Sequence, residues 1–367
     1  MAASTGGGSA AGAAANGLGD HVRGLDTLRL VAALWVVVGH FNPPRIAVQS
    51  DGSPLIQLVN SFQGIFVNGP AAVIVFFVIS GFCIHYPFAT GRPFNAGTFV
   101  IRRFLRIGLP LSAIVLISPL ADLSFALFDR MAIWSLFCEL IYYAAYPLVR
   151  VTRRHVSWIV LLAASFGAAL CVPLLDIAHS TRSTVNPTWG DYPSFGIAGN
   201  TILGFPCWLL GARLADWWTV GKKEQIDAPG VSRVWMWRFA IWGLSCLALV
   251  LRFHTPLGYP WTLNLFAIAC YFWLQQEIVH FTRVNPSGFM EWGGKWSYSI
   301  YLVHPVAQAA WVGSVLTQEA KSLVGWALLM TFIALTSYVF YCIVEEPSHR
   351  VAKALARKFG QLRVVPA

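Results

Sequence analysis

Long apolar runs separated by short, arginine-rich polar segments dominate the pattern along the chain. A helix of about 20 apolar residues crosses roughly 30 Å of hydrocarbon. By this measure the pattern predicts about ten membrane-spanning helices, and thus an all-α polytopic bundle. The predicted spans are residues 26–42, 65–86, 109–128, 131–149, 156–175, 195–217, 235–252, 260–281, 296–316 and 322–344.

The composition supports a membrane protein. Hydrophobic residues make up 56% of the chain and charged residues only 11%, whereas a soluble domain carries about a quarter charged residues. The 16 Trp suit a chain that meets membrane interfaces. We therefore expect a multi-pass protein of the cytoplasmic (inner) membrane that contacts membrane lipids.

The positive charges are unevenly divided between the predicted loops. With the N-terminus inside, 21 of the 26 Lys and Arg residues fall on the cytoplasmic side, as the positive-inside rule requires. This split predicts that both termini are cytoplasmic. It also accounts for the net charge of +10 without a nucleic-acid partner.

Three regions follow from this pattern. Residues 1–23, rich in Ala, Gly and Ser, are predicted to be a disordered tail, residues 24–350 the membrane domain, and residues 351–367 a basic cytoplasmic tail. The seven Cys are scattered singly without metal-ligand spacing, so we expect no metal site.

Polar groups inside the predicted spans are candidate functional residues, because burying them in hydrocarbon is costly. Arg29 and His40 share a helix face about 16 Å apart. Glu139 and His304 fall at a similar depth near the midplane, and Tyr301 lies in the same span as His304. Each alone is also compatible with a structural role, as an interhelical hydrogen bond or a packing aromatic. Their common depth favours a shared site.

A second cluster lies between the second and third predicted spans. Residues 92–106 contain four Arg and no acid, and a helical turn would bring Arg102, Arg103 and Arg106 to one patch. Arginine suits bidentate phosphate recognition. The same residues would also suit a topogenic anchor on anionic lipid headgroups.

Six segments, taken in order, resemble the membrane acyltransferase-3 family and together extend over nearly the whole chain. Each motif is weak alone, but the ordered set is specific. The segments are GLDTLR (24–29) with Gly39 and His40, FFVISGF (76–82), RRFLRI (102–107) with Pro110, WSL (134–136) with Glu139 and Tyr142 or Tyr143, SYSIYLVH (297–304), and Glu346 and Pro347 with Arg350.

The resemblance implies an integral membrane O-acyltransferase that transfers an acyl group, usually acetyl, from acyl-CoA to a carbohydrate or glycolipid acceptor. It implies that Arg29, Arg102, Arg103 and Arg106 hold the donor's phosphates and that His40 is the general base. A covalent acyl intermediate on His40 stays open as the alternative.

Roles for the other polar residues follow from the same reading. Glu139 is expected to orient the imidazole of His40. Tyr301 or His304 is expected to donate a hydrogen bond to the developing oxyanion.

Two other classes of function remain compatible with the sequence. A transporter or flippase of glycans or acyl groups would also carry polar residues at the midplane. A sensor or assembly scaffold would not need arginines at the mouth together with a histidine in the interior. Release of free CoA separates acyl transfer from transport.

Overall fold

The computed structural model describes residues 22–44, 54–183, 185–186, 188–224, 227–312 and 322–362. Within these ranges the chain is helical, and the only strand-like feature is an isolated bridge between Thr181 and Leu257. The principal helices are α2 (Leu25–His40), α3 (Pro54–Ile65), α4 (Gly69–Ala89), α5 (Ala96–Ile117), α7 (Trp134–Thr152), α8 (Trp158–Leu175), α10 (Gly196–Glu224), α11 (Val231–His254), α12 (Tyr259–Arg283), α13 (Gly288–Gly294), α14 (Ser297–Val312), α15 (Leu323–Phe340) and α16 (Glu346–Leu362).

Seven helical stretches in the described part of the chain are long and apolar enough to cross a membrane. They contain α4, α5, α7, α8, α10, α11 and α15. The three other predicted spans coincide with α2, α12 and α14, which are helical but do not meet that criterion. The protein is thus an all-helical, multi-pass membrane protein. The count of ten spans and the cytoplasmic placement of the termini stay predictions.

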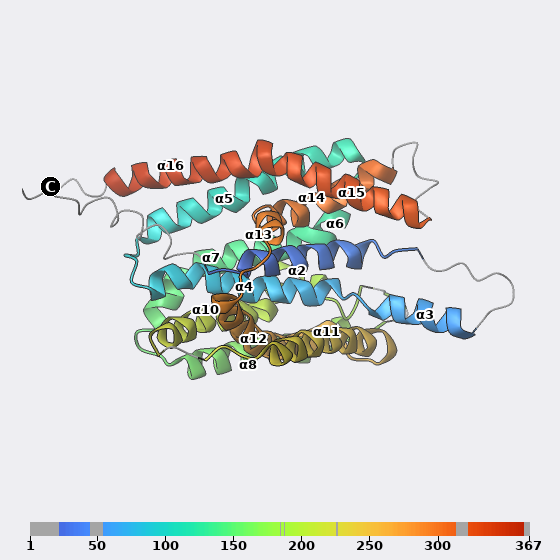
Figure 1. Ribbon diagram of the computed structural model, residues 1–367, viewed down its shortest axis with the longest axis horizontal. Helices are drawn as coiled ribbons and strands as arrows, with labels where there is room; N and C mark the ends of the chain where they lie inside the picture. The colour runs from blue at the N-terminus through green and yellow to red at the C-terminus, as the bar shows by residue number, and fades with distance from the viewer. Residues whose placement is uncertain are drawn as a thin grey trace, which may run out of the picture.

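Helix α4 forms the centre of the bundle, between α2 and α10 (Figure 1). In its span, 72% of the most apolar window is buried, compared with 22% for α8, so α8 presents most of its surface outward. A Cβ on Gly81 would collide with the carbonyl oxygen of Trp208, and one on Gly211 with that of Val78. Glycines on both helices thus let the α4 and α10 backbones touch, as small residues do between membrane helices.

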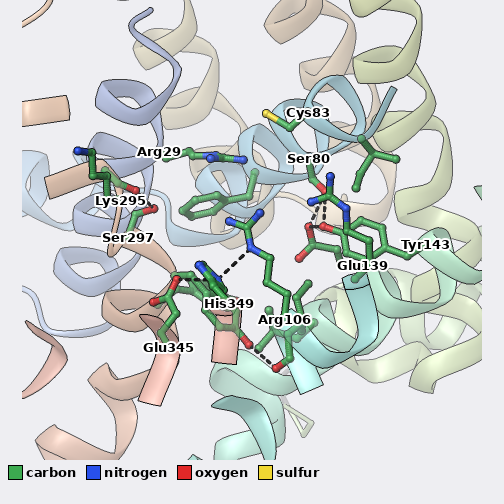
Figure 2. Close-up of a pocket in the computed structure, with 18 of the residues that line it drawn as sticks. Arg29, Ser80, Cys83, Arg106, Glu139, Tyr143, Lys295, Ser297, Glu345 and His349 are labelled. Atoms are coloured by element: carbon green, nitrogen blue, oxygen red, sulfur yellow. Dashed lines mark hydrogen bonds and ion pairs between the residues drawn. The ribbon is translucent and has the colours of Figure 1, made fainter. Parts of the chain in front are cut away.

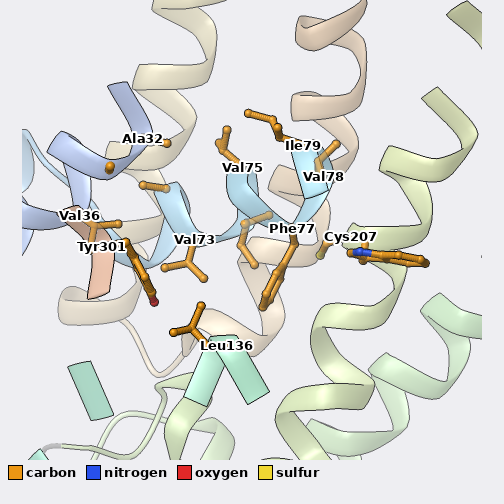
Figure 3. Close-up of a cluster of buried hydrophobic side chains, with 14 of the residues drawn as sticks. Ala32, Val36, Val73, Val75, Phe77, Val78, Ile79, Leu136, Cys207 and Tyr301 are labelled. Atoms are coloured by element: carbon orange, nitrogen blue, oxygen red, sulfur yellow. The ribbon is translucent and has the colours of Figure 1, made fainter. Parts of the chain in front are cut away.

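The core continues from α4 toward α2, α7 and α14. Figure 3 shows Val73 and Phe77 of α4 directed toward Leu136 of α7, with Val36 of α2 and Tyr301 of α14 beside them. The ring of Phe77 meets the ring of Trp134 edge-on at 6.3 Å between centroids. This cluster fixes the polar residues of the same helices relative to one another.

The third span begins earlier than predicted. We expected it at residues 109–128, but α5 starts at Ala96 and ends at Ile117. Asn95 caps its start by accepting a hydrogen bond from the backbone N–H of Thr98 at 2.9 Å. Such a cap starts a helix independently of hydropathy. Arg102, Arg103 and Arg106 therefore lie on α5, whereas Arg92 precedes the helix and Asp122 follows it.

Two π-helical turns interrupt the bundle, at Asp129–Ile133 before α7 and at Tyr341–Glu345 before α16. Short π-helical segments are frequent at functional sites. Both of these turns contribute residues to the cavities described below.

The structure describes the two predicted tails to different extents. Most of the expected disordered tail, residues 1–21, lies outside the described residues. The expected basic C-terminal tail is helical as far as Leu362 and packs against α5.

Candidate active site

A cavity of about 540 Å³, here called cavity 1, lies among α2, α4, α5, α7, α14 and α16. Figure 2 shows polar side chains from these helices directed into it. Its basic lining residues are Arg29, Arg102, Arg103, Arg106, Lys295, His349 and Lys353. Three carboxylates, Asp26, Glu139 and Glu345, also line it. Cations are therefore in excess, which favours an anionic occupant.

The arginines of cavity 1 are held by different contacts. Arg29 forms an ion pair with Asp26, at 3.1 Å between Nη1 and Oδ1. The guanidinium of Arg103 lies about 6 Å from the ring centroids of Phe99 and Tyr143, a separation typical of cation–π contact. Arg106 donates from Nε to Nε2 of His349 at 3.0 Å. Each contact leaves other guanidinium N–H groups available for a ligand.

Glu139 lies in the wall of cavity 1. Its Oε1 accepts hydrogen bonds from the hydroxyls of Ser80 and Tyr143. Ser80 Oγ and the Tyr143 hydroxyl are themselves 3.1 Å apart. Helices α4 and α7 are thus joined by a closed polar triad at the wall of the cavity.

A second cavity of about 660 Å³, here called cavity 2, lies where α2 and α11 end and where α4 and α12 begin. Aromatic side chains in its lining include Trp134, Trp189, Tyr192 and Tyr259. Polar lining side chains are His40, Asn42, Arg130, His179, Asn186, Thr188, Asp191 and Ser194. Both cavity volumes fall within the range of small-molecule sites.

A buried ion pair holds the loop that walls cavity 2. Arg252, only 2% exposed, donates from Nε to Asp191 Oδ1 at 2.9 Å and from Nη2 to the carbonyl oxygen of Trp189 at 2.6 Å. Gly190 between them has φ = +88°, a conformation that glycine adopts without strain. Burial raises the pKa of Asp191, although the guanidinium of Arg252 acts in the opposite direction. The loop is therefore fixed against α11.

His40 lines cavity 2 and is paired with His304 of α14. His40 Nδ1 lies 2.8 Å from His304 Nε2, and the rings stack with centroids 5.0 Å apart. His304 Nδ1 lies 2.7 Å from the carbonyl oxygen of Tyr301. A carbonyl only accepts, so His304 Nδ1 carries the hydrogen, and a neutral His304 must accept at Nε2. His40 then donates from Nδ1 and keeps a free lone pair on Nε2.

Tyr301 lies on the cavity 1 side of this pair. Its hydroxyl is 2.6 Å from Ser135 Oγ, which in turn donates to the carbonyl oxygen of Ala132. Tyr301 and Ser135 line cavity 1, while Trp134, the neighbour of Ser135, lines cavity 2. Val73 lines both cavities. The two cavities therefore approach each other at Val73 of α4.

This arrangement agrees with the comparison to protein families. The acyltransferase-3 family, described as an acyltransferase domain, matches residues 22–343. The chain belongs to this family. It is thus an enzyme, an acyltransferase built into a membrane. No curated protein and no solved structure matches the chain.

In this acyltransferase the eight candidate residues fall into two groups. Six line cavity 1: Arg29, Arg102, Arg103, Arg106, Glu139 and Tyr301. His40 lines cavity 2, and the fully buried His304 contacts His40.

Two of the expected contacts differ in the structure. Glu139 was expected to orient the imidazole of His40, but its carboxylate bonds Ser80 and Tyr143, and the partner of His40 is His304. The expectation that His304 donates to an oxyanion also does not fit, because both of its ring nitrogens are engaged. Glu139 lies on the α7 face directed to cavity 1, whereas His40 is the last residue of α2.

Several lining residues of cavity 1 were not singled out from the sequence. Glu345, His349 and Lys353 recur every four residues, so they fall on one face of the helix that leads into α16. This spacing was a usable signal. Ser80 and Ser135 sit inside recognised motifs, but their hydrogen-bond partners come from distant parts of the chain.

Proposed function

We propose that the chain is an O-acyltransferase that moves an acyl group from acyl-CoA, bound in cavity 1, to a sugar hydroxyl bound in cavity 2. Acetyl is the first choice of acyl group, since it is usual in the proteins that the chain resembles. One observation carries the proposal: a cation-lined cavity and a cavity lined by His40 share the lining residue Val73. Such a junction would allow a reaction between two separately bound substrates.

The lining of cavity 1 supports acyl-CoA as the donor. A CoA thioester carries three phosphate groups, and the cavity supplies Arg29, Arg102, Arg103 and Arg106, which suit phosphate recognition. Arg29 and His40 are eleven residues apart on α2, or about 16 Å along the axis. An extended pantetheine arm spans such a distance, which would bring the thioester to the junction.

The lining of cavity 2 supports a carbohydrate acceptor. Flat aromatic faces such as those of Trp189 and Tyr192 suit the apolar faces of sugar rings. The side chains of Asp191 and Asn42 offer donors and acceptors for hydroxyl groups. A glycan or glycolipid headgroup could therefore place one hydroxyl near the free Nε2 of His40.

In the proposed reaction His40 is the general base. Its Nε2 takes the proton of the acceptor hydroxyl as the oxygen attacks the thioester carbon. The C–S bond then breaks, and the CoA thiolate leaves and takes up a proton, so that an ester and free CoA result. His304 would hold His40 in the required tautomer through the bond to Nδ1.

The remaining cavity 1 residues would position the donor. Tyr301 lines cavity 1 beside the junction. Its hydroxyl is the candidate donor to the oxyanion, which requires the O–H to turn from Ser135 Oγ, the group to which it donates in the structure. Glu139 would hold Ser80 and Tyr143 in place and would balance part of the positive charge. The placement of the enzyme in the inner membrane, with cavity 1 open to the cytoplasm, belongs to the same proposal.

A purified-protein assay tests this function. The protein is reconstituted with acetyl-CoA and a panel of envelope glycans, and free CoA and acetylated glycan are measured together. Stoichiometric release of CoA with glycan acetylation supports the proposal. Movement of glycan across a vesicle membrane without thioester consumption would instead identify a transporter.

A further inference from the structure

Helix α16 follows the residues that the family comparison matches, although its first turns carry the last resembling motif, and it completes cavity 1. The match ends at residue 343, and α16 begins at Glu346. His349, Ala352 and Lys353 of α16 line the cavity, together with Glu345 just before it. Figure 1 shows α16 lying alongside α5, which carries the arginine cluster.

The meeting of α16 and α5 concentrates positive charge. His349 lies within the electrostatic influence of Arg102, Arg103, Arg106 and Lys353. Arg357, one turn beyond Lys353, lies close enough to Arg102 for their charges to repel each other. Juxtaposed like charges are unfavourable without a counter-charge.

The carboxylates of the cavity do not neutralise this cluster. Within the described ranges, Arg102, Arg103 and Lys353 form no ion pair with a carboxylate. Glu345 is 1% exposed, accepts a hydrogen bond from Ser299 and lies 3.6 Å from His349 Nε2. Asp26 is paired with Arg29. The excess of cations therefore favours the binding of an anion.

The exposed Lys353 marks the solvent side of the cavity, whereas Arg103 is half-buried beside Tyr143, whose hydroxyl bonds Glu139. Arg102 lines the same cavity, acts with Lys353 on His349 and lies close to Arg357 of α16. In acyl-CoA the 3′-phosphate on the ribose is far from the thioester. When the thioester lies at the junction, the 3′-phosphate would lie near the cations at the solvent side of the cavity.

We infer that Lys353 of α16 and Arg102 of α5 bind the 3′-phosphate of the acyl-CoA donor, so that α16 makes the enzyme selective for CoA over dephospho-CoA. This inference rests on the proposed donor. It assigns a part in donor recognition to α16, which follows the matched residues 22–343.

Binding of CoA and of 3′-dephospho-CoA to the purified, full-length protein tests the inference without an acceptor. The wild type is expected to bind dephospho-CoA roughly tenfold or more weakly, as for a lost charge-assisted contact. Lys353→Ala and Lys353→Gln are expected to weaken CoA binding to a similar degree and to leave dephospho-CoA binding unchanged. Lys358→Ala, an exposed cation on α16 that does not line the cavity, is the matched control and should change neither.

The possible outcomes separate the inference from the proposed function. Equal binding of the two ligands by the wild type, or equal weakening of both by the Lys353 variants, would overturn the inference. Equal binding is also the result expected if an anionic lipid headgroup occupies the site. If neither ligand binds and acetyl-CoA is not consumed, the proposed donor itself fails.

Discussion

His40 Nδ1 lies 2.8 Å from His304 Nε2, so two imidazoles from helices at opposite ends of the sequence share one hydrogen bond. In a Ser–His–Asp triad a carboxylate fixes the tautomer of the catalytic histidine. Here a neutral imidazole, fixed in turn by a backbone carbonyl, occupies the corresponding position. The proton accepted by His40 would therefore be stabilised by a dipole rather than by a full negative charge.

Replacement of His40 tests the proposed base. His40→Ala is expected to lower the transfer rate at least about 100-fold, the lower range of general base catalysis, while the protein still inserts and folds. His155→Ala, which alters an exposed histidine in a loop, should leave the rate unchanged. Rates come from CoA release, and folding from size-exclusion profiles. Full activity of His40→Ala would refute the mechanism.

Replacement of His304 tests its positioning role. In His304→Ala the imidazole of His40 loses its acceptor at Nδ1, so both tautomers become accessible and kcat should fall roughly tenfold or more. His304→Gln, whose amide oxygen can accept the same bond, should restore part of kcat with an unchanged KM for the donor. A packing role alone predicts loss of stability in both variants and no such partial rescue.

The transfer rate should depend on pH through His40. Neutral His40 has a free lone pair on Nε2, whereas protonated His40 has none, so the rate should fall as the pH is lowered. The acidic limb should follow the uptake of one proton, and it should shift in His304→Gln because the partner of Nδ1 changes. A flat acidic limb over the range in which the protein stays folded would argue against His40 as the base.

The arginines of α5 should govern donor affinity. Arg103→Ala combined with Arg106→Ala removes two cations that line cavity 1, and each lost contact to a charged group is worth about 1.5–3 kcal/mol. The KM for acetyl-CoA should therefore rise by more than about tenfold with a smaller change in kcat. Arg92→Ala is the control, because Arg92 belongs to the same arginine cluster (residues 92–106) but does not line the cavity. If the double variant changes membrane topology alone, the arginines serve as a lipid anchor.

The contact between α4 and α10 should tolerate no side chain. In Gly81→Val the added Cβ meets the carbonyl oxygen of Trp208, which cannot move without bending α10. Overpacking of this kind costs about 1–3 kcal/mol or more, so the melting temperature should fall. Gly243→Ala, at a helical glycine with open space around it, should not lower it. An unchanged melting temperature in Gly81→Val would mean that the helices do not touch as described.

The sequence predicted the limits of several helices to within a few residues. The spans expected at 156–175 and 260–281 coincide with the helices α8 (Trp158–Leu175) and α12 (Tyr259–Arg283). It failed where polar residues continue a helix: α5 starts at an Asn95 cap well before its apolar run, and α16 is amphipathic. Hydropathy detects neither the capped start of α5 nor the amphipathic helix α16. The capping residue and the helical periodicity of the sequence indicate them.

The sequence predicted which residues form the site, but not how they are divided between cavity 1 and cavity 2. Helical periodicity placed Arg29 and His40 on one face of α2, and depth placed Glu139 and His304 near the midplane. Neither argument says which neighbouring helix each side chain faces. That depends on how α2, α7 and α14 rotate about their axes, which the packing around Val73 and Phe77 determines.

The position of Val73 has a consequence for the membrane as a permeability barrier. Among the described residues, Val73 is the one that lines both cavities. A transmembrane enzyme of this design must let an acyl carbonyl come within bonding distance of a nucleophile while keeping ions and protons from leaking through. In the proposed reaction, the packing around Val73 would therefore also limit the leakage of ions and protons between the two cavities.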